Sequence, residues 1–225
     1  MLKQTVTAMA LCLAAGIANA QSNARYEVTI TNITPGQSFT PQLVVTHPGD
    51  AILFRLGEPA SEALEVLAEA GDTGPLTEAL AGVAMDVQTI PGLLGPGEQS
   101  SVVVTGQPGR GYISVAAMMI PTNDNFVAMN RVKLPAAGAV MQLVPAYDAG
   151  TEHNDQNCAN IPGPQCGGAG EGYSPGPNEG DEGFVHIGNG MHELGDQDSS
   201  GNAIIDPQTY DWRNSVARIT VRRMN

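Results

Sequence analysis

Positive charge is scarce in this sequence. Lysine and arginine together number 10 against 23 aspartates and glutamates, and the formal net charge is −13 at pH 7. The only run of basic residues is Arg222-Arg223, near the end of the chain. An acidic surface of this kind repels phosphate backbones and anionic lipid headgroups. We therefore expect neither nucleic acid nor a charged membrane surface as a partner.

Common catalytic motifs are also missing. The chain has no Walker loop, no dinucleotide-binding fingerprint and no zinc-protease helix motif. Residues Gly172–Gly176 match the Gly-x-Ser-x-Gly pattern of hydrolases. However, Pro175 follows the serine and has no N–H to offer an oxyanion hole. We therefore predict that the protein is not an enzyme.

No apolar stretch is long enough to cross a membrane. The longest near the start, Val6–Ala18, is well short of the roughly 20 residues that a spanning helix needs. It follows the single charge of Lys3 and ends in Ala18–Ala20, a small-x-small pattern that signal peptidase cleaves. We predict a signal peptide over residues 1–20, cleaved near Ala20. A single domain over residues 21–225 would then be secreted or periplasmic, with no membrane span.

Cysteine is rare, with three in the whole chain. Cys12 lies in the predicted signal peptide, which leaves Cys158 and Cys166. A pair of cysteines in an oxidising compartment predicts a disulfide. It would close a loop of about nine residues and stabilise the fold by roughly 2.5 kcal/mol in the chain-entropy model. A thiolate metal site is the alternative interpretation.

Short segments with strand character make up most of the remaining chain. Residues Tyr26–Ile33 alternate apolar and polar side chains, and Tyr112–Ile120 form a nearly continuous apolar run. Short strands separated by turn residues at this spacing are typical of an antiparallel β-sandwich. The other predicted strands are residues 43–46, 51–54, 101–105, 126–129, 140–144, 184–187 and 215–221.

Helical periodicity is confined to one region. Residues 61–70 place their leucines on one face, and Gly71 is a natural stop; 75–81 predict a second short helix. From Ala149 to about Glu182 the sequence is rich in glycine and proline, which predicts a long loop, ordered in part by the disulfide. The predicted fold class is all-β, an antiparallel β-sandwich with one or two short helices and this loop.

Three acidic residues lie in predicted loops that could meet. Asp148 and Glu152 are four residues apart, and Gly150 between them permits a sharp turn. Asp124 lies in a loop between two apolar strands, and loops at one end of a sandwich come together. Calcium prefers carboxylate and carbonyl oxygens on such loops. The pattern is compatible with a calcium site, although acidic loops also occur as plain turns.

The same residues carry a family resemblance. Residues 119–127 resemble the Ser-Pro-Asp-Trp-Phe-Val stretch of the spondin N-terminal domain, and 147–152 resemble its Trp-Asp-Ala-Gly-Thr-Asp motif. The helical segment 64–80, with its central Gly-Asp, and the terminal segment 210–219 look like bacterial members of that family. The resemblance therefore spans nearly the whole predicted mature chain.

The resemblance implies a β-sandwich related in shape to C2 domains, holding one Ca²⁺ through three acidic side chains. Carried onto this sequence, these ligands are Asp124, Asp148 and Glu152. Two positions depart from the family pattern: Asn125 replaces the tryptophan, and Glu152 replaces an aspartate. Glutamate can still ligate calcium, but its extra methylene changes the geometry of the site.

Two functions follow as hypotheses. The first is an exported calcium-binding β-sandwich, a non-catalytic recognition or adhesion module for an extracellular or periplasmic protein or glycan. The second is an exported copper- or zinc-binding protein that uses His153, His186 and His192, since imidazole is a common ligand of both metals.

Overall fold

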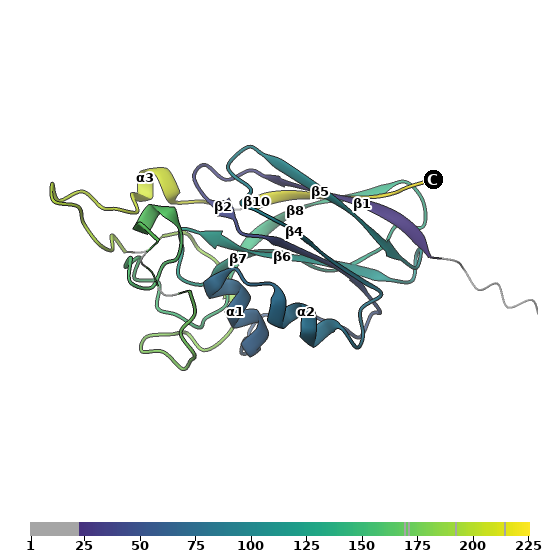
Figure 1. Ribbon diagram of the computed structural model, residues 1–225, viewed down its shortest axis with the longest axis horizontal. Coiled ribbons are helices and arrows are strands. Elements are labelled where there is room, and N and C mark those ends of the chain that lie inside the picture. The colour runs from purple at the N-terminus through teal and green to yellow at the C-terminus, as the bar shows by residue number, and fades with distance from the viewer. Residues whose placement is uncertain (1–22, 169, 171, 192, 214) are drawn as a thin grey trace, which may run out of the picture.

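The computed structural model describes residues 23–168, 170, 172–191, 193–213 and 215–225 (Figure 1). The predicted signal peptide lies outside the described residues. Over the ranges described, no helix is long and apolar enough to cross a membrane. Antiparallel strands dominate and helices are few, which confirms the predicted all-β class.

One continuous sheet winds into a nearly closed sandwich. Its strand order is β4-β3-β6-β7-β8-β10-β1-β5, with β2 paired to β6 and β9 paired to β8. The strands are β1 (Ala24–Asn32), β2 (Ser38–Phe39), β3 (Gln42–His47), β4 (Asp86–Ile90), β5 (Gln99–Gly106), β6 (Tyr112–Ile120), β7 (Asn125–Lys133), β8 (Ala139–Asp148), β9 (His186–Ile187) and β10 (Ser215–Arg223).

Strand β8 connects the two layers. Its last residues pair with β7, from Val127 opposite Ala146 to Asn125 opposite Asp148, whereas its earlier part pairs with β10. At the far edges of the sheet, Asp86 of β4 accepts hydrogen bonds from the backbone N (2.7 Å) and Oγ1 (3.0 Å) of Thr105 in β5. These contacts bring the two edge strands together.

The inner faces of the two layers enclose the main core. Val28 and Ile30 of β1 and Ile219 of β10 pack there with residues of the opposite layer such as Val115 and Val127. All five side chains are fully buried or nearly so. Burial of apolar surface at this interface is the main force that holds the layers together.

A second apolar layer lies on the outer face of β3, β6 and β7, where helices α1 (Glu62–Ala70) and α2 (Gly74–Leu80) pack (Figure 1). Leu64 and Leu67 of α1 meet Ala116 and Phe126 of the sheet. Strand β6 is thus covered on both faces, which explains its continuous apolar sequence. The Ser61 hydroxyl caps the start of α1, and Gly71 ends it in the left-handed conformation (φ 70°), as the sequence predicts.

The predicted elements differ from the observed ones at four places. Residues 51–54 do not form a strand: Leu53 and Phe54 are apolar because they fill the layer under the helices. Strand β4 was not predicted, since as a partly exposed edge strand it has little apolar alternation. The short strand β2 and the short helix α3 (Pro207–Tyr210) were not predicted either.

The loop after β8 gathers with α3 at the end of the sandwich opposite the C-terminus (Figure 1). Over its described residues it contains one short 3₁₀ helix, Pro164–Cys166, and otherwise no helix or strand before β9. The long predicted loop is therefore present, and it lies at the same end as the β7 start and the β8 end.

We expect Leu67→Ala to destabilise the protein by roughly 2–5 kcal/mol, because the side chain is fully buried between α1 and the sheet. The matched control is Glu62→Ala on the exposed face of the same helix, which should change stability by less than about 0.5 kcal/mol. Urea unfolding followed by circular dichroism measures both. Equal effects of the two variants would contradict the packing of α1 on the sheet.

Candidate metal centre

The three predicted acidic residues lie at one end of the sandwich, around the start of β7 and the end of β8, but their carboxylate oxygens do not all lie within 4.8 Å of one another. Asp124 immediately precedes β7, and its carbonyl oxygen accepts a hydrogen bond from the backbone N of Ala149 at 3.2 Å. Asp148 ends β8. A turn at Gly150 (φ 67°) then brings Glu152 back toward the strands. A side chain at position 150 would collide with the backbone of Phe184, so the turn requires glycine for both its conformation and its space.

Asp124 is fully buried, and only one of its carboxylate oxygens is used. Oδ2 accepts hydrogen bonds from the backbone N of Thr151 (2.7 Å) and of Glu152 (3.1 Å). Oδ1 is buried and has no hydrogen-bond partner within the described part of the chain. Burial, and then the nearby Asp148 carboxylate, raise the pKa of Asp124 well above its usual range.

Asp148 is also buried, but its oxygens are better satisfied. Oδ1 accepts from the backbone N of Gly150 at 2.9 Å, and Oδ2 accepts from the side-chain amides of Asn154 (2.9 Å) and Asn125 (3.1 Å). Asn125, which departs from the family pattern, is therefore part of the network that holds Asp148 in place.

Glu152 resembles Asp124 in having one free oxygen. Oε1 accepts from the Ser174 hydroxyl at 2.7 Å, whereas Oε2 is buried and lacks a partner among the residues described. Burial is the main cause that raises the pKa of Glu152 to about 7. Ser174 also donates its backbone N to Glu69 of α1 at 2.9 Å, and burial raises the pKa of Glu69 to about 6.

These carboxylates have little positive charge near them. Asp124, Asp148 and Glu152 are only 0%, 2% and 6% exposed. Among the described residues, no lysine or arginine nitrogen lies within 4.0 Å of them, and the one basic side chain in that range is His186. Buried carboxylates are costly without a counter-charge. Hard oxygen donors with unsatisfied lone pairs fit a cation such as Ca²⁺.

A different trio has the closest potential ligand atoms. Within the described ranges, Asp148, Glu182 and His186 form the one group of three or more such side chains whose ligand atoms all lie within 4.8 Å of one another. Sequence reasoning missed Glu182, although the four-residue spacing from Glu182 to His186 was available as a signal. Asp148 belongs both to the predicted trio and to this cluster.

Two of the three predicted histidine ligands are described, and they lie beside different carboxylates. His153 lies on the surface, with Nε2 3.7 Å from Glu193 Oε1. His186 faces Asp148 instead. His192 lies outside the described residues.

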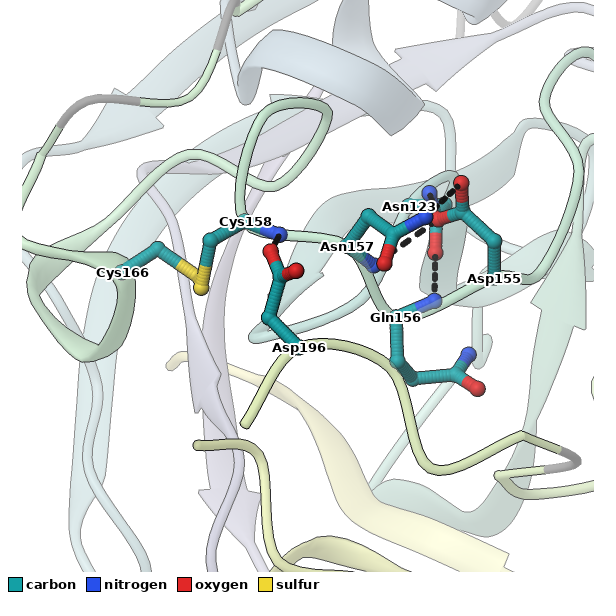
Figure 2. The surroundings of a disulfide bond; sticks show 7 residues. All are labelled: Asn123, Asp155, Gln156, Asn157, Cys158, Cys166 and Asp196. Carbon is teal, nitrogen blue, oxygen red and sulfur yellow. Dashed lines mark hydrogen bonds between the residues drawn. A yellow bond between two sulfur atoms is a disulfide. The ribbon is translucent and has the colours of Figure 1, made fainter. Parts of the chain in front are cut away.

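The disulfide predicted between Cys158 and Cys166 is present (Figure 2). Asp196 holds the loop from one side by accepting from the backbone N of Cys158 at 2.9 Å. On the other side, Asn123 donates to Asp155 at 3.0 Å and accepts from the backbone N of Gln156 at 3.3 Å. The disulfide loop is therefore tied to the residue next to Asp124.

Comparison with known proteins bears on the first part of the domain. The family model Spondin_N matches residues 22–158, more than half of the chain, and this range includes Asp124, Asp148 and Glu152. No curated protein matches the chain. Glu182 and His186 lie beyond the matched range. From the family match and the β-sandwich together, the chain belongs to the Spondin_N family, the spondin N-terminal domain.

Proposed function

We propose that this protein is an exported calcium-binding β-sandwich that serves as a non-catalytic recognition module. Spondin_N is in general a family of extracellular domains without enzymatic activity. The observation that carries the calcium proposal is the pair of buried carboxylate oxygens, Asp124 Oδ1 and Glu152 Oε2, that have no partner in the part of the chain described.

Asp124, Glu152 and Asp148 would hold the ion. Calcium takes six to eight oxygens and tolerates both carboxylates and carbonyls, which suits loops of this kind. When bound, it would supply the positive charge that these buried side chains lack. Glu152 can bind the ion through one or both of its carboxylate oxygens. If Oε1 takes part, it would bind the ion while also accepting the hydrogen bond from the Ser174 hydroxyl.

The consequence of binding would be structural. Asp124 already joins the β7 start to the loop after β8, and Glu152 joins that loop to Ser174. Ser174 in turn contacts Glu69 of α1. An ion at the carboxylates would therefore fix several loops at one end of the sandwich, and we propose this ordered surface as the site that recognises an extracellular protein or glycan.

We expect calcium to raise the melting temperature relative to protein in EGTA. At calcium concentrations 100-fold above the dissociation constant the gain is about 2.7 kcal/mol, or roughly 5–10 °C for a domain of this size. Asp124→Asn should abolish most of the gain, whereas Asp50→Asn, which removes the same charge from an exposed turn, should retain it. Differential scanning calorimetry measures all three. A wild-type melting temperature that is the same in calcium and EGTA would contradict the proposal.

In EDTA, we expect the protein to become more stable as the pH falls from 8 to 5. Burial raises the pKa of Glu152 to about 7 and that of Glu69 to about 6. A carboxyl whose folded pKa is raised stabilises the fold fully below its unfolded value and loses that contribution as the pH rises through the folded value. For Glu152 alone the difference is at most about 3 kcal/mol.

Urea unfolding in EDTA at pH 5 and pH 8 measures this dependence, and Glu152→Gln should weaken it. Saturating calcium should oppose it, because ligand carboxylates must lose their protons to bind the ion. If the free energy of unfolding of the metal-free protein falls steadily from pH 8 to pH 5, burial does not raise the pKa of these carboxyl groups.

A further inference from the structure

A second cluster of potential ligands lies beside the calcium carboxylates. His186 Nε2 is 3.5 Å from Asp148 Oδ1 and 3.9 Å from Glu182 Oε2. Unlike the predicted calcium ligands, this cluster includes an imidazole nitrogen. Two of its three members come from the segment beyond the Spondin_N match.

The backbone holds the three side chains in place. His186 is in β9, directly opposite Asp148 at the end of β8. Glu182 lies in the preceding turn, which is fixed by a 2.9 Å hydrogen bond from Gly183 N to Gly150 O. On the far side of the turn, Val185 N donates to Glu58 O at 2.9 Å. The ligand positions are therefore set by main-chain contacts on both sides rather than by a free loop.

The two ring nitrogens of His186 have different surroundings. Nδ1 lies 3.0 Å from the carbonyl oxygen of Ile187, which can only accept, so Nδ1 must carry a proton. In the neutral ring Nε2 then has a lone pair. This atom is buried and, within the described residues, makes no hydrogen bond, although it faces two carboxylates.

A lone pair that faces two negative carboxylates is stabilised by a cation between them. Histidines that bind metals commonly donate their other ring N–H to a backbone carbonyl, which fixes the tautomer and the orientation of the ring. The contact to Ile187 has this form. The Phe184 ring lies beside the imidazole, with ring centroids 5.6 Å apart, and covers part of it.

The ligand types favour a transition metal over calcium. Calcium binds oxygen ligands, whereas one imidazole with two carboxylates suits a divalent ion such as Zn²⁺. Neighbouring ligand atoms around tetrahedral zinc are roughly 3.3 Å apart, given bonds of about 2.0–2.1 Å. The two distances from Nε2 exceed this by only a few tenths of an ångström. The side chains of Glu182 and His186 are 33% and 25% exposed, so the cluster lies near the surface rather than in the core.

We propose that Asp148, Glu182 and His186 form a zinc-type site, separate from the calcium site but sharing Asp148 with it. Three protein ligands would leave a fourth position for water or for a group from a partner. This proposal does not depend on calcium binding, since Glu182 and His186 are not among the calcium ligands. It shares His186 with the histidine site predicted from the sequence and adds two carboxylates.

The test is a titration of the full mature protein, stripped with EDTA, dialysed and then saturated with calcium. Zn²⁺ binding is measured by isothermal titration calorimetry, and Co²⁺ is used as a spectroscopic probe of the ligands. We expect one equivalent of Zn²⁺ to bind, and a cobalt absorption spectrum of a nitrogen- and oxygen-ligated ion. His186→Gln and Glu182→Gln should each weaken zinc binding at least tenfold.

His153→Gln is the matched control, because it removes a surface histidine that also lies near a carboxylate. It should leave zinc binding unchanged. Folding is checked by the melting temperature in calcium, and Glu182→Gln, at a partly exposed position, gives a second test if His186→Gln is unstable. No stoichiometric Zn²⁺ binding by the wild type, or equal binding by the wild type and both site variants, would overturn the proposal.

The calcium proposal can fail or hold independently. Glu152→Gln should reduce the calcium-dependent rise in melting temperature and leave zinc binding intact. Glu182→Gln should weaken zinc binding and leave the calcium-dependent rise in melting temperature unchanged. Loss of both metals in both variants would show a single shared site and would overturn the assignment of two.

Discussion

The main constraint on this end of the molecule is a group of buried carboxylates that, among the residues the structure describes, has no lysine or arginine beside it. Asp124, Asp148 and Glu152 are almost fully enclosed, and in the described chain His186 is the only basic side chain within 4.0 Å of them. Backbone and side-chain amides satisfy some of their oxygens but cannot balance the charge. A cation, or protonation, must do so.

The fold creates this constraint through β8. Strand β8 pairs with β10 over most of its length and with β7 at its end. Asp148, the last residue of β8, therefore lies where the two layers meet. Asp124 arrives there from the start of β7, and Gly150 turns the chain so that Glu152 returns to the same place. The disulfide loop and the Ser174 segment then pack around it.

Much of this arrangement could be predicted from local sequence. Three features were predictable because each has its own local cause: the cap residues of α1, the unbroken apolar run of β6, and the disulfide. Residues 51–54 show the limit of such reasoning, because apolar side chains under a helix resemble those of a strand. Strand β4 is a strand that the side-chain pattern does not reveal, since it is defined by its pairing with β3.

The sequence singles out three acidic residues as a hypothesis but does not show their surroundings. Loop position makes Asp124, Asp148 and Glu152 plausible ligands, and the family resemblance selects them as a set. The partnership of His186 with Asp148 depends on β9, a two-residue strand formed 38 residues further along the chain. Nor can a sequence reveal which oxygen atoms are left without a hydrogen bond, as that depends on every neighbour at once.

The most direct measurement is the anomalous scattering of crystals grown with calcium. We expect an anomalous peak with oxygens of Asp124 and Glu152 about 2.3–2.6 Å away, the usual range for calcium ligands. A well-ordered structure with no peak at these carboxylates, and with Asp124 Oδ1 and Glu152 Oε2 bonded only to protein or water, would contradict it.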